Sequence, residues 1–123
     1  MFIALAREAG LDAKYQLVNT QPTWDVESGF LVRNNHVNVL LEGLKAPGNS
    51  ISDITVDFNL VRVANDVPRT TISDAYAESM FYGNLAIQQL HKGDKRAAFG
   101  YLKRAVLTEP ANTDAWNNLG ALY

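Results

Sequence analysis

Apolar and polar residues alternate with a period of two in two stretches of the first half of the chain, at 34–42 and at 53–63. Alternation of this kind predicts β-strands that bury one face and expose the other. The residues between the two stretches include Pro47 and Gly48, a pair typical of turns. Two strands joined by a short turn form an antiparallel hairpin. Its apolar face is expected to contain Val37, Val39, Leu41, Val56 and Phe58, and its polar face His36, Asn38, Asp57 and Asn59.

Upstream of this hairpin the pattern predicts one helix and one further extended segment. The helix covers residues 2–9 and would end at Gly10, because glycine adopts the left-handed conformation at little cost. Residues 11–18 are expected to form an extended segment, and residues 19–29 are expected to form a loop. No helix start signal precedes residue 2, and the last helical pattern is still running at the end of the sequence. We therefore expect the chain to be a fragment of a longer protein.

The pattern changes after about residue 73, where apolar residues recur every 3.6 positions instead of every two. This spacing predicts helices at 74–91, at 95–108 and from 113 to the end. A polar stretch separates the two patterns and is expected to be a linker. The predicted fold class is α+β, with a short antiparallel sheet and one N-terminal helix at 1–63, the linker at 64–72, and an all-α helix-turn-helix repeat at 73–123.

The helical part of the sequence matches itself at an offset of 34 residues. Tyr82 aligns with Trp116, and Asn84-Leu85-Ala86 aligns with Asn118-Leu119-Gly120. A period of this length, combined with helical patterning, is typical of repeats that stack pairs of helices. A single repeat cannot bury its own apolar face, and about three are needed for a stable stack.

These residues resemble the tetratricopeptide repeat. The stretch Trp116-x-x-Leu119-Gly120-x-x-Tyr123 is similar to the start of that family's signature. Gln89 differs from the family pattern, which has an aromatic residue at this position. The resemblance covers about 45 residues and implies one complete repeat plus the first helix of the next. The preceding unit shares Tyr82, Leu85, Ala86, Gly93-Asp94, Ala98, Ala105 and Pro110 with the same family.

The resemblance implies that this part of the chain binds a protein or peptide. Gly83, Ile87 and Leu90 would line the groove side of the first helix. Some family members hold a C-terminal carboxylate with basic and amide residues, which are absent at Gly83 and Ile87. We therefore expect an apolar helix or an extended peptide as the ligand. The last helix would expose an apolar face, so we also expect a dimer that forms through this helix.

Composition narrows the remaining possibilities. The formal net charge is −2, with both signs scattered along the chain, which disfavours nucleic-acid binding. No apolar run reaches the roughly eighteen residues that a membrane span needs. The sequence has no cysteine and two histidines, which argues against a disulfide framework, a cysteine nucleophile within these residues and a zinc site. We expect neither a metal nor a cofactor.

The first half of the chain resembles the transglutaminase-like, papain-related domain over roughly residues 2–60. The predicted helix and the extended segment after it are similar to the region that follows the active-site helix in that family. His36 in Asn35-His36-Val37 and Asp57 in Val56-Asp57-Phe58 match the family's histidine and aspartate. The resemblance implies thiol-based acyl transfer, with His36 as base and Asp57 orienting its ring. By the same resemblance the nucleophilic cysteine would lie upstream of Met1.

The register of the predicted hairpin favours the same pair. Opposed residues in an antiparallel hairpin have a constant index sum, and a turn centred between Ala46 and Pro47 gives 93, which places Asp57 opposite His36. Asp53 would face His36 only with an earlier turn, which would leave the proline inside a strand. Asp57 is therefore favoured over Asp53. The alternative is a surface histidine with an unrelated carboxylate nearby.

Two functions of different classes follow from the sequence. In the first, the chain is a protein-interaction module attached to a truncated transglutaminase-like domain that is inactive without a cysteine. In the second, it is part of a cysteine-dependent acyl-transferase or peptidase. A cysteine upstream of Met1 in the parent protein would favour the second. Proteins of this mixed type resemble bacterial ones that are often exported, which implies an exported or periplasmic location.

Overall fold

The structure is a computed structural model that describes residues 2–18, 24–27, 30–33, 36–45, 47–57 and 67–123, with side chains for all of these except 24–27 and 30–33. The chain divides into two compact units. The sheet unit comprises Met1–Gln21 and Asn35–Ser73, and the helical unit comprises Pro22–Asn34 and Asp74–Tyr123. The structure combines a four-stranded antiparallel sheet with four helices, so the predicted α+β class is confirmed.

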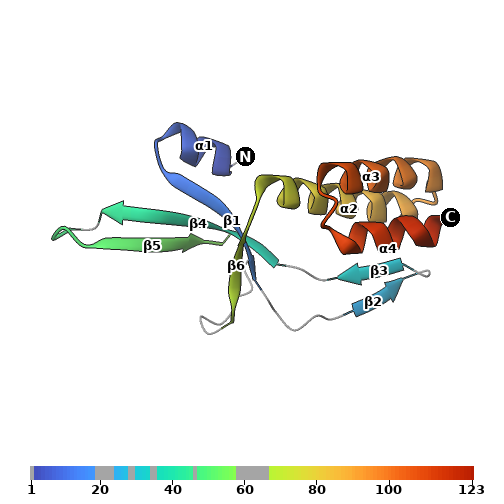
Figure 1. The fold of residues 1–123 in the computed structure, drawn as a ribbon, viewed down its shortest axis with the longest axis horizontal. Coiled ribbons are helices and arrows are strands. Elements are labelled where there is room, and N and C mark those ends of the chain that lie inside the picture. Colours follow the sequence, from blue (N-terminus) through green and yellow to red (C-terminus); the bar gives the residue numbers. More distant parts are fainter. Residues whose placement is uncertain (1, 19–23, 28–29, 34–35, 46, 58–66) are drawn as a thin grey trace. The chain divides into compact units, whose positions relative to one another are not determined.

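The sheet unit contains one helix and a four-stranded antiparallel sheet in the order β5-β4-β1-β6 (Figure 1). Helix α1 and strand β1 agree with the helix and the extended segment predicted from the sequence. The second predicted strand is shorter than expected in the described residues, and 58–63 lie outside them. The elements are α1 (Phe2–Glu8), β1 (Asp12–Val18), β4 (His36–Lys45), β5 (Ile51–Val56) and β6 (Arg69–Ile72).

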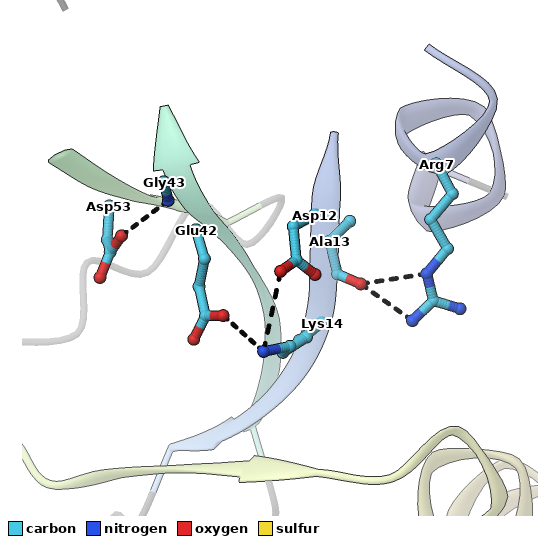
Figure 2. Close-up of polar contacts among 7 residues, drawn as sticks. All are labelled: Arg7, Asp12, Ala13, Lys14, Glu42, Gly43 and Asp53. Atoms are coloured by element: carbon cyan, nitrogen blue, oxygen red, sulfur yellow. Dashed lines mark hydrogen bonds and ion pairs between the residues drawn. The ribbon is translucent and has the colours of Figure 1, made fainter. Parts of the chain in front are cut away.

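One face of the sheet forms the apolar core of this unit. Val39 and Leu41 of β4 are buried there together with Ala13 of β1, and Ile3 and Ala6 of α1 pack against them. The alternation of β4 therefore points its apolar residues inward, as the sequence predicts. The helix is also held by a polar contact, which Figure 2 shows. The Arg7 guanidinium donates from Nε and Nη2 to the Ala13 carbonyl, at 3.1 and 2.8 Å.

The hairpin between β4 and β5 differs from the predicted register. The index sum of opposed residues is 95 at Val39↔Val56 and 96 at Lys45↔Ile51, instead of 93. The turn is later than expected because the chain reverses between Lys45 and Ile51, where Gly48 and Asn49 adopt positive φ values of 92° and 62°. The change of sum marks a bulge at Gly43, where φ is 67°.

Residues 69–72 are a strand and not part of a linker. They form β6, which pairs with β1 from Tyr15↔Ile72 to Val18↔Arg69. The sequence missed this strand because four residues, two of them threonine, are too few to show a clear period of two. Residues 64–66, the start of the expected linker, lie outside the described residues.

The helical unit contains the three predicted helices and a two-stranded hairpin. The bounds of α2 (Asp74–His91), α3 (Lys95–Thr108) and α4 (Thr113–Leu122) agree with the predicted ranges. Residues 24–27 were expected in a loop but form β2 (Trp24–Glu27), which pairs with β3 (Phe30–Arg33), and β3 lies beside α4 (Figure 1). A hairpin with such short strands gives little periodic signal in the sequence.

Small residues set the packing of α2 against α3. Ala86 of α2 and Ala98 and Ala105 of α3 are fully buried, and Leu102 fills the space beside them. Gly93, at φ 80°, ends α2 in the left-handed conformation. Two hydrogen bonds close the helix end there, from Gly93 N–H to the Leu90 carbonyl and from Asp94 N–H to the Gln89 carbonyl, both at 2.9 Å.

A buried hydrogen-bond chain joins all three helices. The Ser79 hydroxyl of α2 donates to the Ala105 carbonyl of α3 at 2.9 Å. The Asn112 Nδ2 donates to the Ser79 hydroxyl oxygen at 2.9 Å, and the Asn112 Oδ1 accepts from the Ala115 N–H at the start of α4. Ser79 and Asn112 are almost completely buried. Removal of either side chain would therefore leave a polar group of the other one buried without a partner.

Two glycines of the helical unit are expected to respond in opposite ways to alanine. Gly83→Ala should raise the free energy of unfolding by about 0.5–1 kcal/mol, because glycine weakens a helix interior and a Cβ at this position meets nothing within 4 Å. Gly93→Ala should lower it by about 1 kcal/mol, because its φ is positive. Urea titration of both variants measures the difference. A stabilising Gly93→Ala would contradict the helix end described above.

Removal of the Ser79 hydroxyl is expected to destabilise the helical unit. Ser79→Ala should lower the free energy of unfolding by about 1–3 kcal/mol, because the buried Asn112 amide loses its acceptor. Gln88→Ala is the matched control, since Gln88 is an exposed polar residue of the same helix. Equal stability of the Ser79→Ala and Gln88→Ala variants would show that the buried chain contributes nothing.

The Lys14 ammonium of the sheet unit contacts Glu42 across β1 and β4, and Asp12 at 3.9 Å (Figure 2). The hydrogen bond to Glu42 raises the pKa of Lys14 above its ordinary 10.5. Because the pKa of Lys14 is higher in the folded state than in the unfolded state, the ion pair stabilises the fold fully below pH 10.5. This contribution to the free energy of unfolding is lost as the pH rises through the folded-state pKa. The stability difference between the native protein and Lys14→Met should be constant near neutral pH and shrink in the alkaline range. Urea midpoints against pH test this, and a difference that shrinks below pH 9 instead would contradict it.

Candidate functional site

His36 and Asp57 meet where β4 begins and β5 ends. His36 is the first residue of β4, and Asp57 follows the last residue of β5. Because the two strands are antiparallel, the start of one lies beside the end of the other. The His36 Nε2 and the Asp57 Oδ2 are 2.5 Å apart. Their side chains are 18% and 26% exposed, so the pair is partly shielded from solvent but accessible.

The contact forms although the predicted register was wrong by two positions. At an index sum of 95 the residue opposite Asp57 is Asn38, and His36 lies diagonally across, one step along β4 on the same face. Diagonal neighbours on one face of an antiparallel pair are within reach when the side chains are long. The rival Asp53 has a different role, since its Oδ1 accepts a hydrogen bond from the Gly43 N–H at the bulge, at 3.0 Å (Figure 2).

The geometry suits proton transfer through the His36 ring. An ionised Asp57 only accepts hydrogen bonds, so the Nε2 of His36 carries the proton that it donates to the carboxylate. In a neutral ring the other nitrogen, Nδ1, is then the one that can take up a proton. A carboxylate that holds a histidine in one tautomer is the arrangement that general-base catalysis uses.

The polar face of the sheet is more enclosed than the sequence predicted. The face of His36 and Asn38 was expected to be open, but Asn38 is only 3% exposed, and Gln16, directly opposite on β1, is 8% exposed. Arg69 of β6 shares this face, because it is opposite Val18, two residues along β1 from Gln16. Sequence reasoning missed Gln16 and Arg69. The only available signal was a glutamine in the middle of an otherwise apolar end of β1.

The three residues predicted to line the groove of the helical unit are on α2 but differ in their surroundings. Leu90 packs against the buried cluster between the helices, so part of its surface belongs to the core. Gly83 and Ile87, four residues apart on one face of the helix, are both half-buried. A Cβ built at Gly83 would meet no side chain, and no backbone outside its own helix, within 4 Å, so there is room for a side chain at this point.

Other kinds of site find no support in the described part of the chain. Its His, Asp and Glu side chains form no group of three or more that could hold a metal ion. None of its helices is long and apolar enough to cross a bilayer. No family model, curated protein or solved structure matches the chain. The functional assignment therefore depends on the geometry of the two units.

The tautomer of His36 provides a direct test of the pair. In its neutral form His36 should carry its proton on Nε2, because Asp57 accepts from that nitrogen. Asp57→Ala should shift His36 toward a mixture of the two tautomers. Long-range ¹H–¹⁵N correlation spectra at alkaline pH measure this, and His91 in the other unit is an internal control. An Nδ1-protonated ring in the native protein would rule out the contact.

Proposed function

We propose that the helical unit is a protein-binding module of the tetratricopeptide type. The observation that carries the proposal is the fully buried alanine contact between α2 and α3, made by Ala86, Ala98 and Ala105. Small residues at these positions let two antiparallel helices approach closely, which is how a repeat of this kind builds one layer of a stack. The match between the sequences of α2 and α4 at an offset of 34 residues supports the start of a second layer.

The binding surface in this proposal is the face of α2 that contains Gly83 and Ile87. The missing side chain at Gly83 and the half-buried aliphatic side chain of Ile87 form a surface without charge. Such a surface suits an apolar helix or an extended peptide and does not suit a terminal carboxylate. Because Leu90 is partly committed to the core, it would contribute less to binding than the other two.

Peptides selected from a displayed random library against the full chain test this surface. Peptides that bind the native protein should lose at least about tenfold in affinity for Ile87→Asp, because a carboxylate placed against an apolar ligand is desolvated without a partner. Gln88→Asp is the matched control, since Gln88 is the exposed neighbour of Ile87 on the same helix. Equal loss for both variants, or no loss for either, would reject α2 as the binding surface.

Helix α4 is proposed to join two copies of the chain. Its Gly120 aligns with Ala86, which is fully buried, yet a Cβ at Gly120 meets nothing within 4 Å. Trp116 and Tyr123 of the same helix are 50% and 90% exposed. We expect a concentration-dependent dimer that Trp116→Lys converts to a monomer, as measured by sedimentation equilibrium. A native protein that stays monomeric at millimolar concentration would contradict this.

A second candidate function is favoured by the contact between His36 and Asp57. The pair would serve as the base and its orienting carboxylate in thiol-dependent acyl transfer or peptide hydrolysis, with a thiol supplied by residues upstream of Met1.

The chain of 123 residues, which lacks cysteine, should show no thiol-dependent activity. A longer product of the same gene that includes an upstream cysteine should hydrolyse an activated ester, and His36→Ala should abolish this while Ile87→Asp leaves it unchanged. Activity that survives His36→Ala would remove His36 from the mechanism.

A further inference from the structure

Three side chains beside the His36–Asp57 pair contain buried polar atoms without a hydrogen-bond partner. They are Gln16 of β1, Asn38 of β4 and Arg69 of β6, here called the amide cluster. The unpaired atoms are Gln16 Oε1, Asn38 Oδ1, Asn38 Nδ2 and Arg69 Nε, and no others of this kind occur among the described residues. Asn38 is 3% exposed and Gln16 8%, so both are more than nine-tenths buried.

The strand register places the amide cluster on one continuous patch of the sheet. Asn38 and Gln16 are directly opposed across β4 and β1, and residue 71 of β6 is opposed to Gln16. In the adjacent row Val18 has His36 on one side and Arg69 on the other. Opposed residues share a face, so the cluster and the His36–Asp57 pair lie together on the face away from α1. All of these residues belong to the sheet unit.

Among the described residues, no backbone or side-chain group satisfies these atoms. Buried polar groups in folded proteins nearly always have a partner, because burial without one costs free energy. Residues that serve only the fold would form bonds to each other, as Ser79 and Asn112 do in the helical unit. Asn38 has both ends of its amide unused. Unused donors and acceptors gathered beside a partly exposed catalytic-type pair are the feature expected of a binding site before its ligand arrives.

We propose that the amide cluster binds the main chain of an extended peptide. The Asn38 amide can accept from one peptide N–H and donate to the neighbouring C=O, which satisfies both of its atoms. Gln16 Oε1 then accepts from a second N–H, and Arg69 Nε donates to a second C=O. Two acceptors and two donors therefore match two peptide groups. The ligand reaches the cluster past the His36 and Asp57 side chains, which are the more exposed part of the patch.

Other ligand classes fit these atoms less well. A carboxylate ligand could accept from Asn38 Nδ2 and Arg69 Nε, but it has no donor for the oxygens Gln16 Oε1 and Asn38 Oδ1, which would stay unpaired. A metal cation would meet the positive charge of Arg69. The inference goes beyond the proposed functions, because peptide binding at this patch requires neither a thiol nor the helical unit.

The test uses the full chain and the capped tripeptide acetyl-Ala-Ala-Ala-methylamide. In ¹H–¹⁵N spectra we expect the Asn38 side-chain amide and the Arg69 Nε–H to shift saturably with the peptide, and acetate at equal concentration to leave them unmoved. Asn38→Leu, which has a similar volume, should weaken binding at least about tenfold. It should also raise the urea midpoint of the free protein, because an unpaired amide is replaced by an apolar group. Asn84→Leu on the exposed face of α2 is the matched control and should change neither binding nor the cluster.

Several results would overturn the proposal. Absence of a saturable shift, an equal response to acetate, or unchanged binding by Asn38→Leu would each reject a peptide site. A lower urea midpoint for Asn38→Leu would show that the amide supports the fold, for instance through internal water, and Gln16→Met repeats this measurement if Asn38→Leu does not fold. Peptide binding is measured on the chain of 123 residues, which contains no cysteine, whereas acyl transfer is measured only on the longer protein. Failure of the peptide site is therefore distinguishable from failure of the acyl-transfer candidate.

Discussion

The pairing of β4 with β5 is the constraint on which the sheet unit depends. Two left-handed residues, Gly48 and Asn49, determine where the chain reverses, and the bulge at Gly43 adds one residue to β4. Side chains in a strand alternate between faces, so a register error of one position would exchange the two faces of β5. An error of two positions preserves the faces, which is why His36 and Asp57 still meet diagonally.

The two faces of the sheet meet different physical requirements. On the face toward α1, apolar side chains pack against one another, and the Arg7 guanidinium donates to the Ala13 carbonyl. On the opposite face, polar side chains are enclosed with part of their hydrogen-bonding capacity unused. A protein normally avoids this arrangement because it lowers stability, and such costs are concentrated at functional sites. The contrast between the faces is the main reason to regard the polar one as the functional one.

The helical unit differs from the sheet unit, because none of its described side chains has a buried polar atom without a hydrogen-bond partner. Alanines bring α2 and α3 into close contact, and the bonds among Ser79, Ala105 and Asn112 align the three helices. The interaction surfaces that we propose are parts of the unit that this packing leaves uncovered, at Gly83 of α2 and at the exposed aromatic residues of α4.

The sequence by itself determined the elements with strong local signals. Helices α2, α3 and α4 were predicted with their observed bounds, because a period of 3.6 over ten or more residues and a glycine or proline near the helix ends act within a few residues. The pairing of His36 with Asp57 was also predicted, because it requires only antiparallel strands and the correct faces.

The short strands β2, β3 and β6 were not predicted, and neither was the burial of Gln16, Asn38 and Arg69. Only the tertiary structure decided these features, since a four-residue strand is defined by the partner that it pairs with. Likewise, a polar residue becomes buried through strands that lie far away in the sequence.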